Sequence, residues 1–109
     1  MILPADTIIA RAKLTKYLLV LQPEDDKSKW LALAGYTLAN AERLEADLRA
    51  QVLPCEAMPA RENQFGHYFE IRAPLTGPNG HTLAVRTIWQ HDALSGVARF
   101  VTLYPSKRA

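Results

Sequence analysis

Cysteine is nearly absent from this sequence of 109 residues, and long hydrophobic runs are missing altogether. Because Cys55 has no second cysteine to pair with, no internal disulfide can form, which is typical of proteins in a reducing compartment. The longest apolar stretches, such as residues 17–21, are far too short to cross a membrane. Residues 1–4 show neither the charged nor the apolar segment of a signal peptide. We therefore expect a cytoplasmic protein with no membrane partner.

Several standard catalytic motifs are also missing. The sequence has no glycine-rich phosphate loop and no nucleophile elbow, and Cys55 has no histidine at a suggestive spacing. The three histidines are His67, His81 and His91, and none stands in a spacing typical of zinc or iron ligands. His67 has the position of a general base at the start of a strand, but a polar strand-end residue is the simpler explanation. We expect no metal site and no cofactor.

Acidic residues are scarce in the second half of the chain. The whole sequence has 13 Lys and Arg against 11 Asp and Glu, and this net charge of +2 creates no strong overall field. After Phe65 only Glu70 and Asp92 are acidic. The basic residues of the same region are Arg72, Arg86, Arg99, Lys107 and Arg108. This basic half indicates an anionic partner, and a solvated sheet face is the alternative explanation.

The first half of the chain shows the periodicity of helices. With 49% hydrophobic and 22% charged residues, the composition is that of an ordinary globular protein, and we expect residues 1–109 to form a single domain. Apolar spacing predicts helices over residues 8–18, 26–33 and 38–52, of which the last is the most clearly amphipathic. The β-branched Ile8 and Ile9 leave an extended start equally open.

Local signals define the ends of these helices. Asp25 or Asp26 is a suitable cap for the second helix, and Gly35 is a natural position for its end. Thr37 would cap the third helix. Residues 54–64 contain two prolines and several polar side chains, which predicts a loop that connects the helices to the strands.

The second half of the chain alternates apolar and polar residues with the period of strands. The expected strands are residues 67–73, 82–89 and 97–104, with Leu83, Val85, Thr87 and Trp89 on one face of the second. Asn79-Gly80 is a strong hairpin signal between the first two strands. Helices followed by an antiparallel meander predict an α+β fold, in which N-terminal helices pack on a C-terminal sheet of three to four strands.

The last strand does not separate cleanly into an apolar and a polar face. Strict alternation places Phe100, Thr102 and Tyr104 on one face, and Arg99, Val101 and Leu103 on the other. Together with Arg86, these side chains have the chemistry of a cleft for an RNA phosphate and its flanking bases, since guanidinium groups bind phosphate and aromatic rings stack on bases. The alternative is a sheet whose second face is half covered by a loop.

Lysines stand just ahead of two apolar runs near expected helix starts. Lys13 precedes one run, and Lys27 and Lys29 precede the other. From these positions the ammonium groups can point at the sheet. Exposed pairing with Asp25 and Asp26 is an alternative explanation for the second group. A cation at a helix start opposes the helix dipole, and this mild cost favours a functional role.

These residues, in their order and spacing, resemble an uncharacterised bacterial family of small toxin-associated domains. The resemblance extends from Lys13 to Pro105 and rests on Lys13-Leu14-x-x-Tyr17-x-Leu19, Lys27-x-Lys29, Phe65-Gly66, Trp89 and Thr102-x-Tyr104. Members are often encoded beside a short partner protein or fused to the C-terminal ends of large toxins. The family is in turn similar to the barnase–EndoU–colicin–RelE superfamily, in which helices precede an antiparallel sheet that cradles RNA.

This resemblance implies a metal-independent ribonuclease in which a ribose 2′-hydroxyl attacks the neighbouring phosphorus. No histidine matches a catalytic motif, so the implied mechanism is that of the RelE-like branch, which relies on lysine, arginine and tyrosine. We expect Lys13 and Lys27 to stabilise charge or move a proton, and Thr102 to donate a hydrogen bond. Arg86, which we add from its charge, would hold the phosphate. The expected substrate-binding residues are Lys29, Arg72, Trp89 and Tyr104.

Three hypotheses follow for the function. The first is a toxin-like endoribonuclease that acts on tRNA or other cellular RNA and is neutralised by a small antitoxin or immunity protein. The second is a non-enzymatic module that binds the product of a neighbouring gene. The third is a descendant that binds RNA without cutting it. The sequence does not indicate an oligomeric state.

Overall fold

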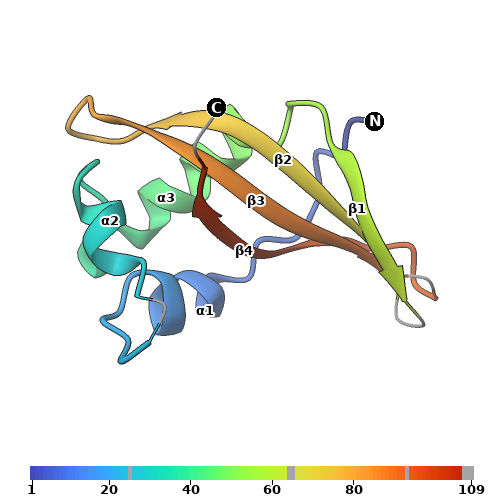
Figure 1. Ribbon diagram of the computed structural model, residues 1–109, viewed down its shortest axis with the longest axis horizontal. Helices are drawn as coiled ribbons and strands as arrows, with labels where there is room; N and C mark the ends of the chain where they lie inside the picture. The colour runs from blue at the N-terminus through green and yellow to red at the C-terminus, as the bar shows by residue number, and fades with distance from the viewer. Residues whose placement is uncertain (25, 64–65, 93, 107–109) are drawn as a thin grey trace.

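A computed structural model describes residues 1–24, 26–63, 66–92 and 94–106, and it shows N-terminal helices followed by an antiparallel sheet (Figure 1). Asp25, one of the two expected helix caps, Phe65 of the resemblance motif, and the basic Lys107 and Arg108 lie outside these ranges. The sheet has the strand order β1-β2-β3-β4. The α+β fold expected from the sequence is thereby confirmed. No helix within the described ranges is long and apolar enough to cross a membrane.

The helical half consists of short elements. They are α1 (Arg11–Lys13), the π-helical turn η1 (Leu14–Leu18), α2 (Ser28–Ala32), the 3₁₀ turn η2 (Leu38–Asn40), α3 (Ala41–Asp47) and the π-helical turn η3 (Leu48–Val52). The last three are continuous and confirm the helix expected over residues 38–52. The backbone N–H of Thr37 donates to Oδ1 of Asn40 at 2.7 Å and closes a capping box at its start.

The first expected helix begins three residues late. Ile8 is extended and pairs with Arg99 of the sheet in a parallel bridge. Its N–H donates to the carbonyl of Ala98 at 2.9 Å, and its carbonyl accepts from the N–H of Phe100 at 2.7 Å. The β-branched start of this segment is therefore in the extended conformation. As a result, the chain enters α1 directly beside the edge of the sheet.

The sheet contains one more strand than the strongest sequence signals indicate. Its strands are β1 (Met58–Asn63), β2 (Gly66–Thr76), β3 (Thr82–Asp92) and β4 (Ala98–Pro105). The prediction of a loop over residues 54–64 was wrong in its second half, because residues 58–63 form the edge strand β1 beside β2. Proline and polar residues suit an edge strand, whose outer hydrogen-bonding groups face away from the sheet.

A β-bulge at Val101 determines which side chains of β4 face the core. Ile88 of β3 pairs with Thr102 and the adjacent Trp89 pairs with Phe100, so Val101 is an extra residue in the ladder. The bulge allows both Phe100 and Leu103 to be buried. Strict alternation had placed Phe100 on the face of Thr102, and this prediction was wrong. The sheet separates into an apolar face and a polar face after all.

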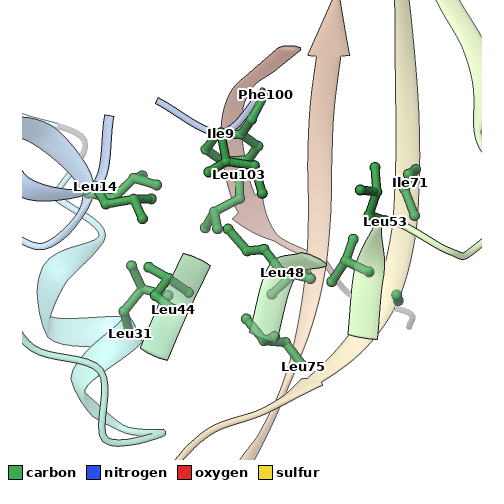
Figure 2. Packing of buried hydrophobic residues seen from close by; sticks show 14 of the residues in the cluster. Ile9, Leu14, Leu31, Leu44, Leu48, Leu53, Ile71, Leu75, Phe100 and Leu103 are labelled. Carbon is green, nitrogen blue, oxygen red and sulfur yellow. The ribbon is translucent and has the colours of Figure 1, made fainter. Parts of the chain in front are cut away.

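The apolar face of the sheet and the helices enclose one hydrophobic cluster. Figure 2 shows Leu14, Leu31 and Leu44 meeting between the helices. Other members of the cluster, including Leu48 and Leu75, connect the third helix to the sheet (Figure 2). The row Leu83, Val85, Thr87 and Trp89 is buried as predicted. This packing fixes the helices against one face and leaves the other face open.

Candidate functional site

A groove of about 390 Å³ lies between the N-terminal helices and β4. Its lining includes Lys13, Tyr17, Gln22, Lys27, Thr102 and Tyr104. We call it the helix–sheet groove. It brings together the two lysines expected to stabilise charge and the two β4 residues expected to contact a substrate. These four residues come from opposite ends of the sequence, so only the tertiary structure makes them neighbours.

Lys27 makes two contacts with β4. Its Nζ donates a hydrogen bond to Oγ1 of Thr102 at 3.2 Å and lies 4.1 Å from the centroid of the Tyr104 ring. The second contact is a cation–π interaction. Because the Thr102 oxygen accepts from Lys27, its own O–H remains able to donate. This geometry suits Thr102 as a hydrogen-bond donor to an anion in the groove.

The position of Lys27 depends on the carboxylate of Asp26. Lys27 immediately precedes α2. Oδ1 of Asp26 accepts from Oγ of Ser28 at 2.7 Å, from the N–H of Ser28 at 3.3 Å and from the N–H of Gln22 at 3.1 Å. The hydrogen bond from the Ser28 hydroxyl lowers the pKa of Asp26; desolvation opposes this shift, and hydrogen bonds from backbone N–H groups add to it. The ionised carboxylate therefore ties the loop to the start of α2.

The other end of α2 is attached to the β2–β3 hairpin. Nδ2 of Asn79 donates to the carbonyl of Leu33 at 2.9 Å. Gly77 approaches Ala34 so closely that a Cβ at position 77 would lie 1.9 Å from the Ala34 carbonyl oxygen. Thus α2 is held at both ends, and Lys27 is carried by a fixed element.

A second hollow, of about 280 Å³, lies on the open face of the sheet. Its lining includes Arg61, Tyr68, Arg86, Ile88, Thr102 and Tyr104. We call it the sheet hollow. It shares Val101, Thr102 and Tyr104 with the helix–sheet groove, so the two spaces lie on either side of the end of β4. Cζ of Arg86 lies 4.9 Å from the centroid of the Tyr104 ring.

The charged side chains that line the two spaces are mainly cations. Lys13 and Lys27 border the helix–sheet groove, and Arg61 and Arg86 border the sheet hollow. Among the described lining residues, Glu24 is the one carboxylate. Outside the lining, Oε1 of Glu70 contacts Nη1 of Arg86 at 3.3 Å and holds the guanidinium group in place. The local charge is positive even though the whole chain is nearly balanced.

Arg72 lies next to this arrangement but outside both spaces. It is the cross-strand neighbour of Arg86, and its Nε contacts Oε2 of Glu70 at 3.2 Å. Arg72, Arg86, Pro105 and Ser106 border a shallower hollow of about 220 Å³. Glu70 therefore bridges Arg72 and Arg86. If Arg72 binds a substrate as expected, it does so from the hollow beside Ser106 and not from the helix–sheet groove or the sheet hollow.

Trp89 is a core residue, contrary to the expected contact with a substrate. Its side chain is 0% exposed, and its Nε1 donates to Oγ1 of Thr87 at 2.7 Å. The ring packs edge-on against Phe100 with the ring centroids 5.2 Å apart. Because it belongs to the buried row of β3, it faces away from Tyr104. Lys29 is exposed and borders neither the helix–sheet groove nor the sheet hollow.

Several residues that line the two spaces were not predicted as site residues, among them Tyr17, Arg61 and Tyr68. Tyr17 stands four residues after Lys13, and this helical spacing was a usable signal. Arg61 was missed because its segment was expected to be a loop. Tyr68 lies within the expected first strand, but its pairing with Arg61 depends on the register of β1.

The histidines lie apart from this site. Nδ1 of His67 contacts Oε2 of Glu62 at 2.8 Å, and neither residue borders the helix–sheet groove or the sheet hollow. This position agrees with a polar strand-end residue. No cluster of three or more His, Cys, Asp or Glu side chains with the geometry of a metal site occurs in residues 1–24, 26–63, 66–92 and 94–106.

Comparison with known proteins identifies a family and no activity. No curated protein and no solved structure matches the chain. One family model matches residues 5–107, a range that includes the helices, all four strands and every residue that borders the helix–sheet groove. The chain therefore belongs to the family described as Domain of unknown function (DUF6883).

Proposed function

We propose that this protein is a toxin-like, metal-independent endoribonuclease that cuts tRNA or other cellular RNA in the helix–sheet groove. One observation carries the proposal. Lys13 and Lys27 from the N-terminal helices meet Thr102 and Tyr104 of β4 around one open groove. A phosphodiester needs this combination of cations, a hydroxyl donor and an aromatic surface.

The charges around the groove suit a phosphate group. Lys27 approaches the Tyr104 ring from α2, and Arg86 approaches the same ring from β3. An RNA phosphate beside the ring would meet both cations, while the ring itself would stack on a base or contact the ribose. Lys13 adds a third positive charge at the helical wall. Electrostatic attraction would then position the scissile bond within reach of Thr102.

The proposed reaction is an internal transfer at phosphorus. The 2′ oxygen forms a bond to phosphorus, the bond from phosphorus to the 5′ oxygen breaks, and the products are a 2′,3′-cyclic phosphate and a 5′-hydroxyl. A base accepts the 2′-hydroxyl proton, and an acid gives a proton to the leaving oxygen. Protonated Lys13 and Lys27 stabilise the negative phosphorane, and one of them gives its proton to the leaving 5′ oxygen. Water takes the 2′-hydroxyl proton and returns a proton to that lysine, while Thr102 donates to a non-bridging oxygen.

Purified protein incubated with total tRNA in EDTA tests the proposal. The wild type should cut RNA and leave cyclic phosphate ends. Lys27→Ala should lower kcat by roughly 10²-fold or more, since single groups that stabilise a transition-state anion have effects of this size. Lys16→Ala removes the same charge from an exposed position outside the groove and should match the wild type. Absence of cleavage by the wild type, or equal cleavage by Lys27→Ala, would overturn the proposal.

A ribonuclease toxin also needs a neutralising partner. We expect a small protein whose acidic side chains complement the lysines and arginines of the helix–sheet groove and the sheet hollow. Expression of the wild type alone should stop growth, and co-expression of the neighbouring gene should restore it. A protein-binding module would instead form the complex without any growth defect. Salt-dependent RNA binding without cleavage would identify a catalytically inactive descendant.

A further inference from the structure

We infer that the sheet hollow is a second RNA subsite, which binds unpaired nucleotides beyond the scissile phosphate and makes single-stranded RNA the preferred substrate. This inference rests on the proposed function of the helix–sheet groove. It assigns a role to Arg61, Tyr68 and Ile88, which the proposed chemistry does not use. The hollow begins at Tyr104, where the proposed catalytic groove ends.

The two spaces form a continuous path over β4. Val101, Thr102 and Tyr104 border both, so a strand that leaves the helix–sheet groove passes directly into the sheet hollow. The bulge at Val101 creates this arrangement because it turns Phe100 and Leu103 to the core while Thr102 and Tyr104 stay on the open face. A substrate longer than one linkage would therefore contact both spaces.

The sheet hollow has a pair of an aromatic ring and a cation at each of its two sides. Arg61 and Tyr68 are cross-strand partners, and Cζ of Arg61 lies 4.6 Å from the centroid of the Tyr68 ring. Tyr104 with Arg86 has the same pairing of an aromatic ring and a guanidinium group at 4.9 Å. Rings and guanidinium planes of this kind stack on unpaired bases, and the guanidinium groups bind phosphates.

The spacing of the two rings points to an extended strand. Tyr104 pairs with Arg86, and Arg86 pairs with Arg72, so Tyr68 lies two strands away and four residues along β2. With ideal sheet dimensions, the Cα atoms of Tyr68 and Tyr104 lie about 16 Å apart. In a duplex, bases are stacked on one another at about 3.4 Å and are not available to protein rings. Only an unpaired strand can place separate bases on Tyr68 and Tyr104.

A simpler explanation for Arg61 and Tyr68 is that they stabilise the edge strand β1 as a cross-strand pair. The two explanations differ in their dependence on substrate length. If the pair only stabilises β1, its replacement lowers stability and changes cleavage of all substrates equally. If it binds RNA, its replacement weakens binding of long substrates and leaves a dinucleotide unaffected, because the dinucleotide fills only the groove.

The test compares steady-state cleavage of a dinucleotide, a single-stranded oligonucleotide and the same oligonucleotide in a duplex. For the wild type we expect KM to be at least about tenfold lower for the single strand than for the dinucleotide, as expected for one stacked base. The duplex should be cut poorly. Tyr68→Ala and Arg61→Ala should raise KM for the single strand about tenfold with kcat unchanged. Tyr68→Phe keeps the ring, so its KM for the single strand should equal that of the wild type.

The outcomes separate this inference from the proposed function. If the wild type cuts none of the three substrates, the proposed function itself is wrong, and the subsite is overturned with it. If it cuts all three with equal KM, the catalytic groove stands and the second subsite is rejected. This comparison needs no variant, so a loss of folding in Tyr68→Ala cannot obscure it. Lys16→Ala is the control for the loss of one positive charge and should leave all three KM values unchanged.

Discussion

The ammonium group of Lys27, at the start of α2, lies 4.1 Å from the centroid of the Tyr104 ring near the end of β4. The guanidinium group of Arg86 approaches the same ring from β3 at 4.9 Å. Two cations at one ring are attracted to its face but repel each other. In the proposed function, a phosphate beside Tyr104 would lie close to both of these cations.

The ring of Tyr104, rather than its hydroxyl, is expected to carry most of its contribution to RNA binding. Tyr104→Ala removes both the stacking surface and the cation–π contacts, and the Kd for a single-stranded oligonucleotide should rise about tenfold or more. Tyr104→Phe keeps the ring, and its Kd should stay within about threefold of the wild type. Fluorescence anisotropy at fixed salt measures both values. An equal loss for both variants would show that the hydroxyl is the important group.

Deletion of Val101 should preserve the fold and impair the site. The pairs Ile88–Thr102 and Trp89–Phe100 flank the bulge, so removal of the extra residue keeps the register on both sides and gives β4 plain alternation. Circular dichroism and urea unfolding should therefore show a folded, cooperative protein. RNA affinity should fall because the bulge lies directly before Thr102, so its removal changes how the end of β4 meets both spaces.

Val101→Ala is the matched control for this deletion, because it shortens the side chain and retains the bulge. Its RNA affinity should remain close to that of the wild type. A deletion variant that does not fold would show that the bulge relieves a strain which simple alternation cannot accommodate. A deletion variant with full affinity would show that the bulge has no role in positioning Thr102.

Gly77→Ala should be strongly destabilising. A Cβ at this position would lie 1.9 Å from the carbonyl oxygen of Ala34, and because this oxygen belongs to the backbone and cannot rotate away, the hairpin must move away from α2. We expect a loss of about 3 kcal/mol in the free energy of unfolding. Gly80→Ala is the comparison: its Cβ meets nothing within 4 Å, and its φ of 88° alone should cost about 1 kcal/mol. Urea unfolding measures both losses of stability. A larger loss for Gly80→Ala than for Gly77→Ala would refute the close approach of Gly77 to Ala34.

Tyr36 should make stability fall at alkaline pH. Its hydroxyl donates to Oδ2 of Asp47 at 2.6 Å, and burial together with this carboxylate raises the pKa of Tyr36 far above its usual range. Because the folded-state pKa is raised, the stabilisation is complete below the unfolded pKa of about 10 and is lost as the pH rises towards the folded value. Tyr36→Phe should therefore be about 2 kcal/mol less stable near neutral pH, from loss of a hydrogen bond to a charged group.

The difference in the free energy of unfolding between the wild type and Tyr36→Phe should become smaller above about pH 10. Chemical unfolding across a pH series measures it. Tyr17→Phe is the control, since the side chain of Tyr17 is 61% exposed and its replacement should change the free energy of unfolding little. A constant gap between the wild type and Tyr36→Phe would mean that Tyr36 titrates normally in the folded protein.

Most of the fold could be predicted from the sequence because it depends on local periodicity. The amphipathic pattern of residues 38–52 and the buried row from Leu83 to Trp89 both appear in the structure as expected. Strand β1 was missed because an edge strand tolerates Pro59 and polar residues that otherwise indicate a loop. The faces of β4 were misassigned because alternation assumes one residue per partner, and the bulge at Val101 breaks this rule.

The sequence by itself determined that the chain carries lysines at its helical end and a hydroxyl and an aromatic ring on its last strand. The tertiary structure decided which of these residues meet. Lys27 contacts Thr102 and Tyr104, and Lys13 borders the same groove, because α2 is held against the hairpin and α1 follows an extended segment paired with β4. Trp89 carries an equally suitable ring, but the pleat of β3 turns it into the core. Such contacts depend on strand register and on packing between distant segments, which no local pattern specifies.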